Sequence, residues 1–215
     1  MASATATSPA PTLDAEPGSS ARTDAALAPM VVEQLRHAHA LQVGALQMFD
    51  GMLDAVRRER TLPEVADLLA KMLNAFELHR EETARHEREV RARLTALGAR
   101  PARRMELAMR AGALARVAIG RIGGQNYGAN ARDAYVFEHL EIATYHLLEK
   151  VAERAGDEET ARLARSHRGD NCDMGQKIRD NWENVLSLLL ASKGIPPARD
   201  RQRQAPAKSS ETGDC

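Results

Sequence analysis

The chain of 215 residues has few aromatic side chains, few cysteines and no net charge. Aromatic residues make up only 3% of it, and β-branched runs are rare, whereas alanine and leucine are abundant. This composition favours helices over strands. Lys plus Arg balances Asp plus Glu at 30 each, so no overall charge draws the protein towards nucleic acid or anionic membranes. Nucleic acid is therefore not expected as a partner.

Cysteine motifs and long apolar runs are also absent. Cys172 and Cys215 are the only cysteines, and their wide separation fits neither a metal motif nor a disulfide framework. No apolar run approaches the roughly 20 residues of a membrane-spanning helix. The first residues have neither the basic start nor the hydrophobic centre of a signal peptide. These absences predict a cytoplasmic protein without a transmembrane segment.

The length suits a single domain with appendages. Residues 1–28 are rich in Ala, Ser, Thr and Pro and contain almost no large apolar side chains. They are predicted to be disordered, because they bury too little surface to offset the entropy lost on ordering. Residues 193–215 are predicted to be disordered for the same reason. The helical bundle is expected over residues 29–192, with a basic crossover at 99–130.

Four long segments within the bundle have apolar residues at helical spacing. Gly98 is expected to end the second helix, whereas Asn130 and Asp157 are expected to cap the third and fourth. Short turns between helices one and two and between three and four predict two antiparallel hairpins. The sequence therefore predicts an all-α four-helix bundle with a long crossover between helices two and three. The four segments cover approximately residues 29–60, 62–97, 130–156 and 157–192.

Each predicted helix carries polar residues in its inward-facing stripe. These are Gln42 in the first helix, His79, Glu82 and His86 in the second, Glu138 and Glu141 in the third, and Asp170 and Asn171 in the fourth. A charge buried without a partner costs several kcal/mol, so such groups need a cation, a hydrogen-bond network or a metal ion. A solvated charged face explains any one helix, but recurrence on four helices favours a shared site. Carboxylates with an imidazole suit iron or manganese.

Two parallel lines of residues run along the third helix. One contains Phe137, Leu140, Leu147 and Val151, and its spacing predicts the face turned towards the core. The other contains Glu138, Glu141, Tyr145 and Leu148. This second line places the two carboxylates at the edge of the predicted core face. In the fourth helix, Trp182 continues the inward stripe and is expected to face the bundle.

Four segments resemble a bacterial ferritin-like family of stress-associated proteins with poorly defined activity. The segments are His79–His86 (HREETARH), Arg132–Leu148 (RDAYVFEHLEIATYHLL), Gly156–Ala161 (GDEETA) and Met174–Trp182 (MGQKIRDNW). The resemblance spans roughly residues 35 to 190 and implies a ferritin-like four-helix bundle. It also implies metal-facing roles for Glu82, His86, Glu138 and Glu141, with His79 nearby.

The chain departs from that family at two positions. Gln42 stands where the family usually has an acid, and Asn171 follows Asp170 where the family usually has an acid pair. An amide can coordinate through its carbonyl oxygen but brings no negative charge. The site is therefore expected to hold fewer than two iron or manganese ions per chain.

Three functions agree with these patterns. The first is a ferritin-like metal-binding bundle in stress or redox physiology, with a metal ion as its partner and homo-oligomerisation left open. The second is a metal-free helical interaction module that keeps the bundle and has lost the metal site. The third is an oxidase or peroxide-handling enzyme, which needs an open metal position and a redox-active metal pair. The arginines of the crossover could touch an anionic surface, but exposure to solvent is the favoured interpretation.

Overall fold

The computed structural model describes residues 17–58, 63–122 and 126–195, with side chains described for 26–58, 63–116 and 126–195. Its six α-helices and one short 3-10 helix include no strand within these ranges, which confirms the all-α prediction. The elements are α1 (Pro17–Arg57), η1 (Pro63–Val65), α2 (Ala66–Ala96), α3 (Arg103–Ile122), α4 (Tyr127–Arg154), α5 (Glu158–Asp180) and α6 (Trp182–Ser192).

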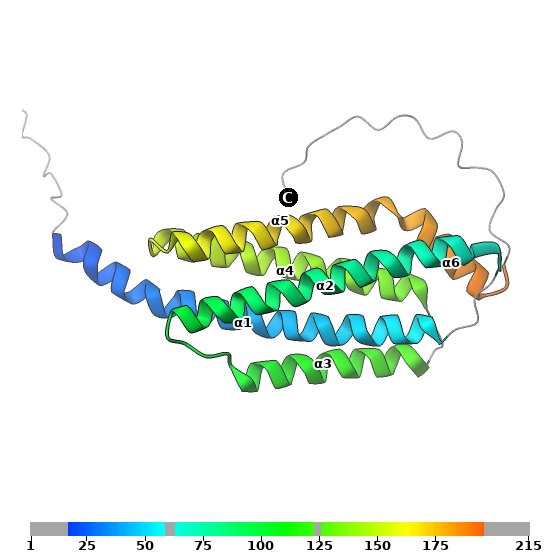
Figure 1. The fold of residues 1–215 in the computed structure, drawn as a ribbon, viewed down its shortest axis with the longest axis horizontal. Helices are drawn as coiled ribbons and strands as arrows, with labels where there is room; N and C mark the ends of the chain where they lie inside the picture. The colour runs from blue at the N-terminus through cyan, green and yellow to red at the C-terminus, as the bar shows by residue number, and fades with distance from the viewer. Residues whose placement is uncertain (1–16, 59–62, 123–125, 196–215) are drawn as a thin grey trace, which may run out of the picture.

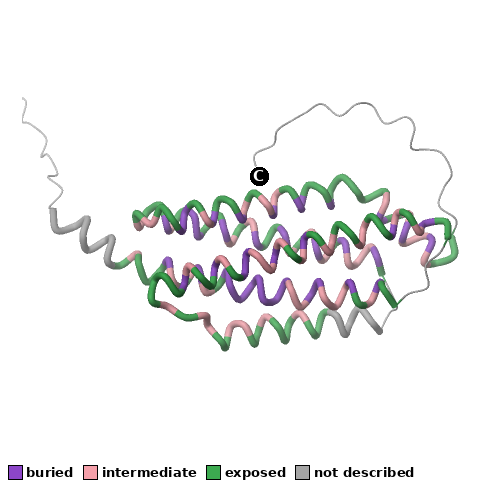
Figure 2. Tube along the Cα trace, in the orientation of Figure 1, coloured by how far each residue is buried: buried purple, intermediate pink, exposed green. Residues whose placement is uncertain are grey.

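The four longest helices form a bundle of two packed hairpins (Figure 1). Helix α1 packs on α2 and α4, while α5 packs on α4 and, more lightly, on α2. Helix α3 lies outside this bundle along α1, so the predicted crossover is largely helical. Helix α6 closes one end against α4 and η1. Figure 2 shows buried positions concentrated on the inward faces of the four long helices.

Two apolar layers enclose the polar residues of the four inward-facing stripes, which together form a polar belt across the bundle. One layer contains Leu35, Leu94 and Leu148, and the next contains Phe49 and Met174, among other residues. In each long helix, the polar belt residues fall between the residues of these two layers. Burying one leucine or phenylalanine side chain contributes about 1.5–3 kcal/mol. The layers therefore stabilise the bundle and also keep bulk water away from the polar residues between them.

The start of α1 differs from the prediction. The sequence places residues 17–28 in a disordered segment, whereas α1 begins at Pro17 and includes Pro29 within it. Residues 21–28 include four alanines, which favour a helix, whereas Pro29 inside α1 removes one backbone hydrogen bond and disfavours it. Residues 1–16 and 196–215, also predicted to be disordered, lie outside the described residues.

Helix caps agree with the sequence at α5 and differ at α4. The Asp157 side chain accepts a hydrogen bond from the backbone nitrogen of Thr160 at 3.0 Å, as predicted for the cap of α5. Helix α4 is capped by Asn126, which accepts from the nitrogen of Ala129 at 2.9 Å, so the predicted cap at Asn130 was four residues late. Gly98, just beyond α2, has a φ of 68°, a conformation that favours glycine.

The predicted fourth helix is divided in two at Asn181. This break changes the rotational phase of the residues after it. Trp182 is 39% exposed and meets the ring of Tyr135 edge-on, so the expectation that Trp182 faces the bundle was wrong.

The basic crossover contacts the bundle through several side chains, including its single acid. Glu106 Oε1 of α3 lies 3.4 Å from Nδ1 of the buried His39 in α1. Arg116 forms an ion pair with Asp133 at the start of α4, so it is not simply solvated. Arg103 and Arg104 are exposed, as the favoured interpretation of the crossover expects.

None of the described helices has the length and hydropathy needed to cross a membrane. Cys172, in α5, is disulfide-bonded, whereas the cysteine spacing predicted no disulfide framework. A disulfide requires two Cα atoms that lie close together and Cβ atoms that point towards each other, whatever the separation along the sequence. Cys215 lies outside the described residues.

Candidate metal centre

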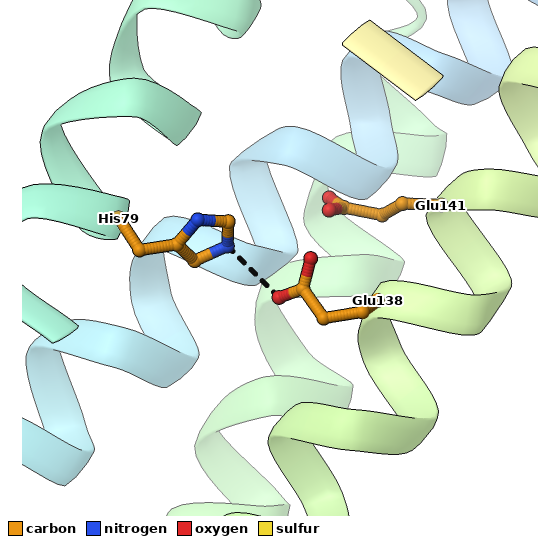
Figure 3. Close-up of side chains that lie close together, drawn as sticks. All are labelled: His79, Glu138 and Glu141. Atoms are coloured by element: carbon orange, nitrogen blue, oxygen red, sulfur yellow. Dashed lines mark ion pairs between the residues drawn. The ribbon is translucent and has the colours of Figure 1, made fainter. Parts of the chain in front are cut away.

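Three buried side chains meet in the middle of the bundle (Figure 3). They are His79 from α2 and Glu138 and Glu141 from α4. Each offers one ligand atom, and these atoms lie within 4.8 Å of one another. His79 Nε2 is 2.8 Å from Glu138 Oε1. All three residues are at most 3% exposed, so their charges are held away from bulk water.

The carboxylates occupy the centre of the core-facing side of α4. Glu138, Glu141, Tyr145 and Leu148 are each at most 1% exposed. In the neighbouring line, Leu140 is 49% and Leu147 is 51% exposed. The prediction that the leucine line faces the core was therefore wrong, and the two acids are more deeply buried than expected.

The surroundings of His79 favour its protonated form. Burial is the largest single influence and lowers its pKa, but hydrogen bonds to Glu138 and Glu82 outweigh it. Together with the charges of Glu138 and Glu141, they raise the pKa of His79 to about 10. In the metal-free state, an imidazolium ion therefore balances part of the negative charge at neutral pH.

Glu141 is pushed in the same direction. Burial, followed by the charge of Glu138, raises the pKa of Glu141 well above its usual range, although a hydrogen bond with Gln42 opposes this. Gln42 is fully buried on α1 and donates from Nε2 to the hydroxyl of Tyr145 at 3.0 Å. The amide at the position of the missing family acid thus connects Glu141 with Tyr145.

Several oxygens in the polar belt have no hydrogen-bond partner. Because burying an unpaired polar atom costs about 1–3 kcal/mol, a cluster of such atoms needs an explanation. The buried oxygens without a hydrogen bond include Gln42 Oε1, Glu138 Oε2, Glu141 Oε1 and Asn171 Oδ1. The two carboxylates and one imidazole of the buried group form a donor set that suits a divalent cation such as iron or manganese. The residues present therefore fit a metal ion.

Glu82 lies on the far side of His79 from the two buried acids. Its Oε2 is 3.2 Å from Nδ1 of His79, and its side chain is half-buried. A carboxylate that holds the second nitrogen of a metal-binding histidine fixes the orientation of the ring. The structure therefore gives Glu82 the geometry of an orienting residue, whereas the sequence predicted a metal ligand.

His86 and Asp170 belong to a second polar cluster. His86 Nε2 lies 2.9 Å from Asp170 Oδ2, and Arg85 also donates to that carboxylate. The ring of His86 stacks on that of His167, with centroids 3.9 Å apart. Burial, followed by the charge of His167, lowers the pKa of His86 to about 4. Among the described residues, only the group of His79, Glu138 and Glu141 has metal-site spacing, so neither His86 nor Asp170 is part of it.

The sequence placed His167 on the inward side of the fourth helix but did not select it as a site residue. It is 1% exposed, and its Nε2 lies 2.7 Å from Glu89 Oε2 of α2. Asn171, one turn further along α5, is fully buried, and neither of its side-chain polar atoms has a hydrogen-bond partner. The spacing between His167 and Asn171 was a signal that these residues share one helix face.

Comparisons with known proteins agree with the helical fold. The profile of a family described as "Domain of unknown function (DUF892)" matches residues 27–189. No curated protein matches the sequence. A crystal structure of a protein from Xanthomonas campestris pv. campestris has a TM-score of 0.60 and 21% sequence identity to this chain. The match covers 79% of this chain and 99% of the other, and at this identity it shows a shared fold alone.

Proposed function

We propose, from the premise that this chain belongs to the DUF892 family, that its bundle is a metal-binding protein for one iron or manganese ion. The observation that carries the proposal is the buried group of His79, Glu138 and Glu141, whose ligand atoms lie within 4.8 Å of one another. The ion would lie between two apolar layers in a ferritin-like arrangement, where ligands come from facing helices of a bundle.

The proposed ligands have distinct roles. Nε2 of His79 and the carboxylates of Glu138 and Glu141 would bind the ion directly, and the carbonyl oxygens of Gln42 and Asn171 are neutral candidates to complete the set. Two carboxylates balance the charge of one divalent ion. A second ion would need negative charge that the two amides do not supply. The proposed capacity is therefore one firmly held ion per chain.

Iron or manganese in this position would supply redox or Lewis-acid chemistry. The protein's own residues would orient His79 through Glu82, exclude bulk water with the apolar layers, and connect Glu141 to Tyr145 through Gln42. This arrangement supports a role in stress or redox physiology, which is the activity that the family resemblance implies. No substrate is assigned to the centre.

Metal analysis tests the proposal directly. The full chain, purified without chelator, is loaded with Mn²⁺ or, without oxygen, with Fe²⁺, dialysed, and analysed by mass spectrometry for bound metal. One ion per chain is expected, and Glu138→Gln and His79→Gln should each lose it. Asp170→Asn is the matched control, since this acid lies in the second polar cluster, and it should keep the ion. Equal loss in all three variants, with intact helical circular dichroism, contradicts the ligand assignment.

A metal-free interaction module is the second candidate, and one observation favours it. His79 has a pKa of about 10, so its imidazolium can partly neutralise Glu138 and Glu141 without any metal. In this alternative, His79, Glu138 and Glu141 form only a structural group of paired charges. If the native protein takes up neither iron nor manganese at neutral or alkaline pH, the structural role replaces the metal-binding proposal.

A further inference from the structure

An apolar groove opens between α2, α5 and α6, at the end of the bundle that α6 closes. Its volume is about 170 Å³, and its lining includes Phe76, Met174, Ile178 and Val185. Unlike the metal centre, it contains no carboxylate or histidine among its lining residues. An apolar hollow that remains open to solvent is a candidate binding site for a small ligand.

The helix break and small side chains create the space. Helix α5 ends before Asn181 and α6 begins after it, so the chain bends beside the groove. Asn181 Nδ2 donates to the carbonyl of Lys177 at 2.7 Å, and Asn184 Nδ2 donates to Asn181 Oδ1 at 2.6 Å. Ala75 of α2 and Ala131 of α4 also line the groove, and their short side chains fill little of it.

Two lysines give the groove a positive rim. Lys71 of α2 and Lys177 of α5 both line it and are exposed. Neither has an ion pair with any residue that the structure describes. Lysine carries its aliphatic stem along apolar surface and its ammonium group in water. An occupant with an apolar body and an anionic end would match both the walls and the rim.

We propose that this groove binds a carboxylate with a short alkyl chain, which is a fatty acid of about six to eight carbons. A closed apolar cavity of about 150 Å³ accommodates benzene, so a groove of about 170 Å³ suits an apolar body of similar size. The alkyl chain lies against Phe76 and Ile178, and the carboxylate meets the ammonium groups of Lys71 and Lys177. Longer chains extend from the open side of the groove.

This site is separate from the metal centre and does not rest on it. Phe76 lines the groove and packs on Phe49, with ring centroids 6.0 Å apart. Phe49 in turn meets the ring of His79, with centroids 5.2 Å apart. Two aromatic rings therefore lie between the groove and the metal-binding histidine, and ligand binding is expected with or without metal.

Isothermal titration calorimetry of the full chain with octanoate and with octan-1-ol tests the charge match. Octanoate should bind at one site and more tightly than octan-1-ol. The double variant Lys71→Gln/Lys177→Gln should bind octanoate about tenfold more weakly, because it loses both exposed ion pairs with the carboxylate, and should bind octan-1-ol as before. Lys150→Gln, in a lysine outside the groove, is the matched control. Equal octanoate affinity in the native and double-variant proteins overturns the proposal.

Filling the groove tests the location. Ala75→Phe should abolish octanoate binding, whereas Ala70→Phe, at an exposed position on the same helix that does not line the groove, should leave it unchanged. Circular dichroism checks that both variants remain helical. If Ala75→Phe keeps octanoate binding, the groove is not the site. If it instead dissociates an oligomer during sedimentation, a second copy occupies the groove and the proposal is wrong.

Discussion

Nε2 of His79 lies 2.8 Å from Oε1 of Glu138, and both side chains are shielded from water. The nitrogen that would bind a metal ion is therefore the one that faces a carboxylate while the histidine is protonated. With a pKa of about 10, His79 keeps its proton at neutral pH. Metal ions bind only the neutral imidazole, so metal uptake must displace this proton.

Metal affinity should consequently rise with pH. Between pH 6 and 9, below the folded-state pKa of His79, each proton displaced makes binding about tenfold tighter per pH unit. Titration of Mn²⁺ against a chromophoric chelator at pH 6, 7, 8 and 9 measures this slope. A flat profile would show that the ion does not replace the proton of His79.

The metal-free protein should become less stable as pH rises. The folded-state pKa of His79 is above its usual 6.5, so its stabilising contribution is complete below pH 6.5 and is lost as pH approaches 10. Glu141, whose pKa is also raised, acts in the same direction above pH 4.5. The free energy of unfolding should fall by roughly 2–4 kcal/mol between pH 6.5 and 10. Urea unfolding in the presence of a chelator measures it.

The variant His79→Gln provides the control for this pH dependence. Its glutamine side chain cannot titrate between pH 6.5 and 10, so the fall in its free energy of unfolding over that range should be much smaller. The same pH slope in the native protein and His79→Gln would assign the titration to another group.

Added Mn²⁺ should raise the melting temperature of the native protein most at alkaline pH, because a ligand that binds only the folded state stabilises it.

Glu82 is expected to tune the site without binding the ion. Replacing it by glutamine removes the charge that faces Nδ1 of His79, and changes of this kind lower metal affinity about 10- to 100-fold. The number of ions per chain should stay at one, whereas Glu138→Gln should lose the ion altogether. Metal titrations of the two variants distinguish these outcomes. A complete loss of metal in Glu82→Gln would make Glu82 a direct ligand.

The sequence predicted the bundle well because its signals are local. Leu35, His39, Gln42 and Phe49 were predicted to share one face, and all are at most 2% exposed. Asn181, by contrast, gave no warning of a helix break, because neither glycine nor proline lies beside it. The rotation of α4 also could not be read from the sequence, because two lines of residues with the same spacing compete for the core.

The sequence predicted less well which polar residues lie together in the candidate metal site, and the reason is geometric. Two turns of helix separate His79 from His86, so they share a face but lie about 10 Å apart along the axis. At that distance His86 meets Asp170 and His167 instead of Glu138 and Glu141. Periodicity tells which side of a helix faces inward, but only the assembled bundle determines which residues stand opposite one another.

The arginines of α3 should matter less to stability than its single acid. Arg103, Arg104 and Arg110 are exposed and form no ion pair with the described residues, so replacing all three with glutamine should change the free energy of unfolding by no more than about 0.5 kcal/mol. Glu106→Gln removes a charge facing the buried His39 and should cost about 1 kcal/mol. Urea unfolding compares them, and a larger effect from the arginines would contradict the assigned roles.

The two amides in the polar belt should limit the number of ions that the centre holds. Gln42 and Asn171 are fully buried, and each has a side-chain oxygen without a hydrogen bond. The double variant Gln42→Glu/Asn171→Glu adds two carboxylates to the polar belt, so metal content should rise from one ion towards two per chain. The same carboxylates repel one another without metal, so the apo melting temperature should fall while the gap between metal-loaded and apo melting temperatures widens. Metal analysis and thermal unfolding measure both effects. If the double variant still binds a single ion, the geometry of the bundle and not its charge limits the number of ions. If neither protein binds an ion, the polar belt has only a structural role.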